Sequence, residues 1–94
     1  IGIDELNENY KKELQLRDDT SGAVILEIHG GSPADKAHLK VMDVITHIDG
    51  KKINGPKDVI EIVRSSKPGQ RLSLQLIREG NKITTTIVPE QSPN

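Results

Sequence analysis

The sequence predicts a small α+β domain, a partly open antiparallel β-barrel or sandwich of five to six strands capped by two to three helices. First, short segments of alternating or β-branched apolar residues recur between turn residues, as in antiparallel strands. Second, the few helical patterns do not alternate with these segments, so no βαβ rhythm indicates a parallel sheet. Third, 94 residues suffice for one modest hydrophobic core but not for two.

The longest helical pattern covers residues 55–66. Pro56 suits its first turn, Asn54 is the expected N-cap, and a Pro-Gly pair at 68–69 ends it. Its apolar residues cover an arc of about 160° on the helix surface: Val59, Ile60, Ile62 and Val63. The helix alone favours burial of all four residues on a sheet. The alternative is that one flank packs in the core while the other flank lines an apolar groove.

The strands are expected at residues 1–3, 23–28, 43–48, 51–53, 71–78 and 82–88. The segment 23–28 is a β-branched run bounded by glycines, and its residues Val24, Leu26 and Ile28 are expected to share one face. Asp49-Gly50 is a strong hairpin turn. The last two strands alternate cleanly, and residues 79–81 join them as a hairpin.

Two shorter helices are expected. The first begins after the polar residues 4–9, with Leu6, Tyr10, Leu14 and Leu16 on its apolar side. The second covers residues 32–37, with Ser32 as N-cap, Pro33 at its first position and Asp35 in capping-box register. It ends at His38, where a positive φ is expected because histidine is enriched in that region. The whole domain is expected at residues 1–90, followed by a frayed tail at 91–94.

Composition excludes several function classes. The formal net charge is −1, with acids and bases interspersed, so there is no basic field for nucleic acid. Tyr10 is the only aromatic residue, which removes base-stacking platforms. The absence of cysteine excludes disulfides and thiolate zinc sites. The chain begins at Ile1 and contains no signal peptide or transmembrane run, so we expect it to be excised from a longer protein.

No catalytic constellation emerges from the polar residues. Ser32 is followed by proline and is best interpreted as a helix N-cap rather than a nucleophile. The three histidines lack the short spacing of a metal pair and are expected at the surface or in turns: His29, His38 and His47. The adjacent acids Asp18 and Asp19 fit a solvated turn. We therefore expect neither an enzyme nor a bound metal or cofactor.

An ordered set of motifs resembles a PDZ domain across nearly all of residues 1–90. These are the run Gly31-Ser32-Pro33-Ala34-Asp35-Lys36-Ala37, the strand Asp43-Val44-Ile45 and the turn Ile48-Asp49-Gly50-Lys51. The order of elements, with residues 1–3 opening the domain and two strands after the long helix, resembles the circularly permuted PDZ domain of bacterial-type proteases. The most similar family is that of the HtrA-type, DegP- or DegS-like, trypsin-like serine proteases.

The sequence departs from the family pattern at two positions where glycine is usual. His38 occupies the first, and Met42 the second, immediately before Asp43. In addition, the residue that precedes Ile1 in the family's carboxylate-binding loop is missing from this sequence.

The resemblance implies a site for hydrophobic C-termini. The amides of Ile1, Gly2 and Ile3 would hold the peptide carboxylate, while Asp4 and Glu5 continue the edge along which the peptide pairs. The last peptide side chain would enter a pocket of Ile1, Ile3, Ile60 and Val63, with Pro56 further along the groove. In this interpretation, Val59 and Ile62 pack in the core, which explains the wide apolar arc of the helix.

The implied function is that of a non-catalytic peptide-binding module, the substrate-recognition or regulatory domain of a serine endopeptidase in bacterial protein quality control. Its partners would be C-terminal or unfolded polypeptide segments and the parent's protease domain, the isolated domain being monomeric. The resemblance implies an extracytoplasmic, membrane-anchored or secreted parent. Two alternatives remain: the PDZ domain of a C-terminal-processing, intramembrane metallo- or Lon-like protease, or a groove used for contacts within the parent or its oligomer.

Overall fold

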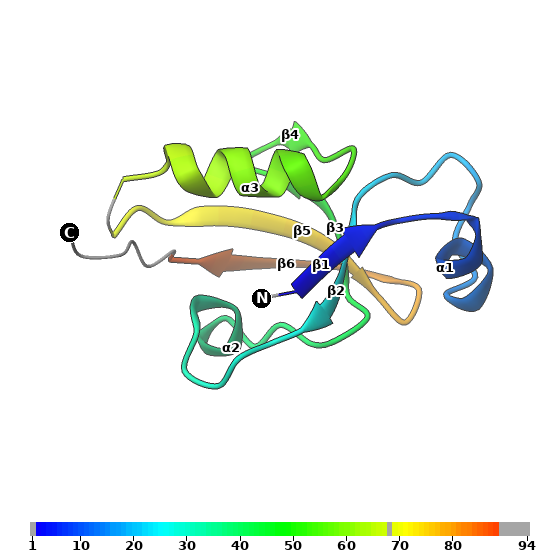
Figure 1. The fold of residues 1–94 in the computed structure, drawn as a ribbon, viewed down its shortest axis with the longest axis horizontal. Helices are drawn as coiled ribbons and strands as arrows, with labels where there is room; N and C mark the ends of the chain where they lie inside the picture. The colour runs from blue at the N-terminus through cyan, green and yellow to red at the C-terminus, as the bar shows by residue number, and fades with distance from the viewer. Residues whose placement is uncertain (1, 68, 89–94) are drawn as a thin grey trace.

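The computed structural model describes residues 2–67 and 69–88 and has the α+β architecture that the sequence predicts (Figure 1). The chain forms, in order, β1 (Gly2–Glu5), α1 (Glu8–Glu13), β2 (Ala23–Glu27), α2 (Pro33–Lys36), β3 (Val44–Ile48), β4 (Lys51–Lys52), α3 (Pro56–Ser65), β5 (Leu72–Arg78) and β6 (Asn81–Ile87). The first strand extends two residues further than the predicted segment 1–3. Ile1 and the tail predicted at 91–94 lie outside the described residues.

All strands belong to one antiparallel sheet. The order across the sheet is β1-β2-β3-β5-β6, and the short β4 pairs with β3 beside this path. In the described part of the chain, β1 and β6 therefore end this path as edge strands, and the two-residue β4 also pairs on one side only. In Figure 1, α3 lies along one side of the curled sheet and α2 along the other.

The main core fills the space between the sheet, α2 and α3. Alternate residues of β5 point into it, so Leu72, Leu74 and Leu76 are buried while the residues between them are exposed. The other buried members are Ala23, Ile25, Ala34, Leu39, Ile45, Ile48, Ile53 and Val59. Aliphatic side chains form this whole core, as the near absence of aromatic residues requires.

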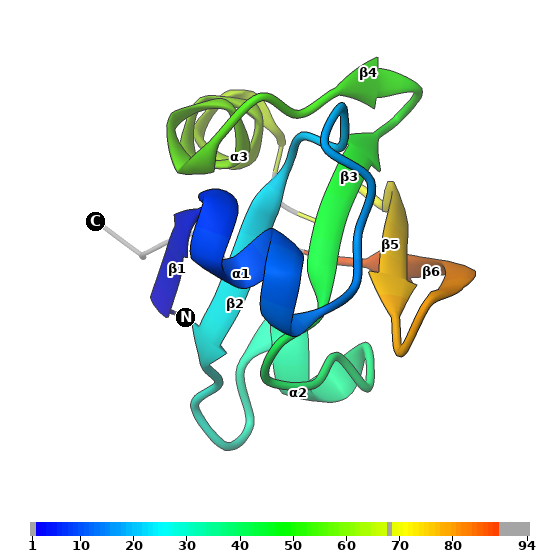
Figure 2. The ribbon, with the colours of Figure 1, turned by 90° about the vertical axis from the view of Figure 1, so that its right-hand side faces the viewer.

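A second, smaller cluster lies beneath α1, which crosses β2 and β3 (Figure 2). Leu6, Val24 and Val44 are buried there, and Tyr10 of α1 packs against them together with Leu14 and Leu16, which follow the end of the helix. The expectation that Val24, Leu26 and Ile28 share one face is wrong, because Val24 belongs to the second cluster whereas Ile28 packs against the main core. The register between β1 and β2 shifts between Gly2 and Ile3, which leaves Leu26 as an extra residue on β2 and moves Ile28 to the face of the main core; Leu26 itself is exposed.

Side-chain caps position α2 as the sequence predicts. The Ser32 hydroxyl accepts a hydrogen bond from the backbone N–H of Asp35 at 3.3 Å, and the Asp35 carboxylate accepts one from Gly31 at 2.9 Å. His38, which follows the C-cap, has φ of 62°, which confirms the predicted positive φ. By contrast, Asn54 is not the N-cap of α3. Gly55 is, and the backbone N–H of Asn54 donates to the Asp58 carboxylate.

The loop before β3 accounts for the glycine that is usual at position 42. The Lys40 carbonyl accepts a hydrogen bond from the N–H of Asp43, and Met42 within this turn has φ of 74°, the conformation that a type II turn requires. The backbone N–H of Met42 also donates to the Ile25 carbonyl, while the N–H of Ile25 donates to the backbone carbonyl of Asp43. Met42 and Asp43 thus both lie opposite Ile25 and form a β-bulge. The first residue of such a bulge, here Met42, is ordinarily glycine.

Candidate functional site

The free edge of β1 is the first half of the candidate site. In the part of the chain that the structure describes, β1 pairs with β2 only, so its other edge presents unpaired backbone groups. The helix α3 contacts both β1 and β2 and runs beside this edge (Figures 1 and 2). An unpaired strand edge next to a helix can accept one further extended chain between them.

The second half of the site is one flank of α3. Val59 is buried in the main core, whereas Ile62 and Val63 are half-buried and pack against it. Ile60 is 49% exposed, so burial of all four apolar residues is excluded. Pro56 lies one turn before Ile60 in the first turn of the helix and is half-buried. The helix therefore leaves apolar surface open on one flank.

The predicted residues of β1 differ in their surroundings. Ile3 is half-buried and packs against the main core, whereas Asp4 and Glu5 are exposed. The Asp4 carboxylate accepts a hydrogen bond from the N–H of Glu5 at 2.8 Å. Gly2 pairs with Glu27, and a Cβ at Gly2 would lie 3.2 Å from that of Glu27, so glycine keeps this segment unobstructed.

The charges around α3 are mixed. Lys57, Glu61 and Arg64 are exposed, and none forms an ion pair within residues 2–67 and 69–88. Away from α3, the hydrogen bond to Asp43 raises the pKa of Arg78, although burial opposes this. Because a raised arginine pKa keeps the group charged at every working pH, this ion pair does not make the candidate site pH-dependent through Arg78.

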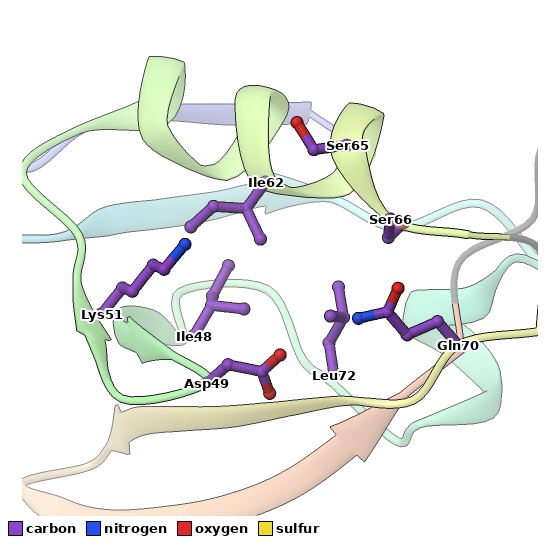
Figure 3. Close-up of a pocket in the computed structure, with 8 residues that line it drawn as sticks. All are labelled: Ile48, Asp49, Lys51, Ile62, Ser65, Ser66, Gln70 and Leu72. Atoms are coloured by element: carbon purple, nitrogen blue, oxygen red, sulfur yellow. The ribbon is translucent and has the colours of Figure 1, made fainter.

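A cavity of about 160 Å³ lies on the opposite flank of α3 and was not anticipated from the sequence. Figure 3 shows Ile62 of α3 pointing into it from one side and Ile48 and Leu72 from the sheet, with polar residues around the opening. The polar lining residues are Asp49, Lys51, Ser65, Ser66 and Gln70. Ile62 thus faces this cavity as well as the core, away from the edge of β1.

Within residues 2–67 and 69–88, the other candidate polar residues occupy capping or surface positions. Ser32 caps α2, as predicted, and His29 and His38 are exposed on separate segments. His47 is half-buried, with Nδ1 3.1 Å from the Thr46 hydroxyl. Across residues 2–67 and 69–88, no group of three acidic or histidine side chains is placed to hold a metal ion. None of the helices in these ranges is long and apolar enough to cross a membrane.

The sequence profile of the PDZ domain family matches residues 8–88, which shows that this chain belongs to the PDZ domain family. The sheet order, with α3 beside the edge strand β1, is the corresponding fold. Within that family, the relatives that this chain matches are serine proteases of the HtrA and DegP type, in agreement with the resemblance in the sequence.

A probable periplasmic DegP-like serine endoprotease of Hahella chejuensis is 31% identical over 91 residues, covering 97% of this chain and 19% of that protein. The periplasmic serine endoprotease DegP of Salmonella typhimurium is 35% identical over 88 residues, covering 94% of this chain and 18% of that protein. This chain therefore spans about a fifth of the length of such relatives.

Solved structures give the same grouping. The HtrA-type protease AlgW, determined with a decapeptide, matches with a TM-score of 0.84 and 25% identity, covering 100% of this chain and 29% of that chain. The HtrA3 PDZ domain bound to the phage-derived ligand FGRWV matches with a TM-score of 0.80 and 22% identity, covering 96% of this chain and 82% of that chain. At 22% identity, the match to the HtrA3 PDZ domain shows a shared fold.

Proposed function

We propose that this chain is the peptide-binding PDZ module of a larger HtrA-type serine protease and binds hydrophobic polypeptide C-termini. One observation carries the proposal: the unpaired edge of β1 lies beside α3, a helix on which the apolar Ile60 is half exposed. An extended peptide would continue the sheet along β1, and its apolar side chains would cover this flank. The peptide-bound AlgW and HtrA3 structures support this assignment.

The site residues would divide into backbone and side-chain roles. The amides of Ile1, Gly2 and Ile3 would donate to the peptide carboxylate, and glycine allows the close approach that such charge-assisted bonds need. The backbone of Asp4 and Glu5 would continue the pairing. The last peptide side chain would contact Ile1 and the three residues Ile3, Ile60 and Val63, while Pro56 bounds the groove further along.

Binding is expected to be weak. Burying a Leu or Val side chain in such a pocket contributes about 1.5–3 kcal/mol. Ordering a flexible peptide opposes much of this gain, so the dissociation constant should be on the order of micromolar or higher. Such affinity suits a module that samples many exposed C-termini.

In the intact protein, the module would recognise exposed C-termini of misfolded proteins and present them to, or activate, a protease domain elsewhere in the chain. The relatives named serine endoproteases, of which this chain spans about a fifth, support such a parent. Their description as periplasmic supports an extracytoplasmic location for it. The domain boundaries would be residues 1–90 for the module, followed by the tail at 91–94.

Calorimetric titration with a peptide ending in valine, as free acid and as C-terminal amide, tests the proposal. The Ile60→Ala substitution should weaken binding of the free acid by roughly fivefold, since it removes apolar contact area from the groove. It should hardly change the free energy of unfolding, because Ile60 is half exposed. Val41→Ala is the matched control, since Val41 is 53% exposed in the loop before β3, and it should bind as the unsubstituted chain does. Equal affinity of acid and amide, or an unchanged affinity of Ile60→Ala, would contradict the proposal.

A further inference from the structure

The two faces of β1 carry different chemistry, as their partners on β2 show. Ile3 pairs with Ile25 and Glu5 pairs with Ala23, and both partners belong to the main core. Asp4 pairs with Val24, which belongs to the second cluster beneath α1. Because residues that pair across antiparallel strands share a face, Ile3 and Glu5 lie on the α3 face and Asp4 lies on the opposite face.

The face of β1 that bears Asp4 is acidic and open. Asp4 is exposed and forms no ion pair within residues 2–67 and 69–88. Gly2 has no side chain to cover this face, and the Glu27 carboxylate lies beside it, with Oε2 3.7 Å from the position of a Cβ at Gly2. Nε2 of the His29 ring lies 3.7 Å from Oε1 of Glu27 and carries a charge only when the ring is protonated.

The α3 face, by contrast, carries charges of both signs. It combines Glu5 of β1 and Glu61 of α3 with the exposed cations Lys57 and Arg64. A peptide strand beside β1 presents successive side chains to the two faces in turn. Charge can therefore discriminate between ligands at positions that face Asp4, while apolar contact dominates at those that face α3.

The register identifies the ligand position that faces Asp4, and this step rests on the proposed function. With the peptide carboxylate at the amides of residues 1–3, the last ligand residue lies opposite Ile3 and its side chain points toward α3. In an antiparallel pair, the penultimate residue then lies opposite Asp4, on the same face. Directly opposite side chains are close enough for opposite charges to attract and for like charges to repel.

We propose that Asp4 is a specificity-determining residue, which selects C-termini with a basic penultimate side chain and disfavours those with an acidic one. Glu27, across Gly2, strengthens the same preference. Substrates would thus be read at two adjacent positions, an apolar last residue by α3 and a basic penultimate residue by Asp4.

Three free-acid peptides that share a final valine and differ only at the penultimate position, which is lysine, glutamine or glutamate, test this inference by calorimetric titration. At low salt, lysine should bind about fivefold more tightly than glutamate, with glutamine between them, as expected for exposed charge pairs. High salt should reduce the difference. Asp4→Asn should largely abolish it without disturbing the strand, because asparagine retains the Oδ1 that accepts the Glu5 N–H.

Two further variants separate the contributions. Glu27→Gln should reduce the lysine preference in part. Glu5→Gln removes the same charge one residue along the strand but on the α3 face, so the penultimate preference should persist in it.

Each outcome bears on a distinct claim. A lysine preference that survives in Asp4→Asn would overturn the role of Asp4. Equal affinity of all three peptides, with the C-terminal amide still excluded, would overturn the charge preference and leave the proposed function intact. Binding of none of the three would overturn the proposed function, and this inference with it.

Discussion

Gly22 illustrates a constraint that acts on a single residue. It is buried immediately before β2, and a Cβ built on it would lie 2.3 Å from the Ile45 carbonyl oxygen, far inside van der Waals contact. The obstacle is backbone of the central strand β3, which cannot move aside without disturbing the pairing of β2 with β3. Glycine is therefore required here by close approach of two chain segments.

Gly22→Ala should accordingly lower the free energy of unfolding by about 3 kcal/mol, as measured by urea denaturation. Gly30→Ala is the matched control, because a Cβ at Gly30 would meet no atom within 4 Å and its φ is not in the left-handed region. The control should change stability by less than about 0.5 kcal/mol. A similar cost for the two substitutions would show that the contact with Ile45 is not what constrains position 22.

Residue-level prediction from the sequence succeeded where chemistry is local. The cap at Ser32 and the positive φ at His38 follow from side-chain type and neighbouring residues, and the structure confirms both. Met42 could not be explained in this way, since its left-handed conformation arises from a turn combined with a bulge opposite Ile25, which requires knowledge of the strand pairing. The same holds for Gly22, whose constraint comes from a distant strand.

An ion pair between Arg78 and Asp43 joins elements that are distant in the sequence. Arg78 at the end of β5 donates to both carboxylate oxygens of Asp43, at 2.9 and 2.7 Å, and to the His38 carbonyl at 3.1 Å. Asp43 is only 1% exposed and also accepts from the Lys40 N–H. The pair thus fixes the loop between α2 and β3 against the hairpin of β5 and β6.

Substitution of the two partners should have unequal effects, because their exposure differs. Arg78→Met leaves the buried Asp43 carboxylate with the Lys40 N–H as its remaining donor, and should lower the free energy of unfolding by about 3 kcal/mol. Asp43→Asn leaves a partly exposed guanidinium that water can solvate, and should cost only about 1 kcal/mol.

Urea denaturation of both variants and of the double variant provides the measurement. The double variant should lose less stability than the sum of the single losses, since each removes the same interaction. Additive losses, or a larger loss for Asp43→Asn than for Arg78→Met, would contradict this account of the pair.

At the level of elements, periodicity predicted the helices and most strands, but not which strand faces would be buried. Ile28 does not share the face of Val24, because the register shift between Gly2 and Ile3 interrupts the alternation of faces, and Leu26 between them is exposed. The second cluster also could not be predicted from the sequence of β2 alone. It arises only because α1 returns across β2 and β3 and buries Val24 from the opposite face.

The whole molecule places two helices in different roles around one sheet. α1 covers the central strands from one face, whereas α3 lies by the edge strand β1 and leaves Ile60 half exposed (Figures 1 and 2). The wide apolar arc of α3 alone could not decide between complete burial and a groove. The decision required the position of β1 as an edge strand, which depends on the topology of the sheet.

The central claim is that a peptide C-terminus binds between β1 and α3, and an NMR amide titration with a hydrophobic peptide tests it most directly. The free acid should shift the amides of residues 2–5 and those of α3 from Lys57 to Arg64, and the C-terminal amide of the same peptide should not. Residues around the cavity on the other flank of α3, such as Lys51 and Gln70, should remain unperturbed. Shifts centred on that cavity, or equal responses to acid and amide, would contradict the account.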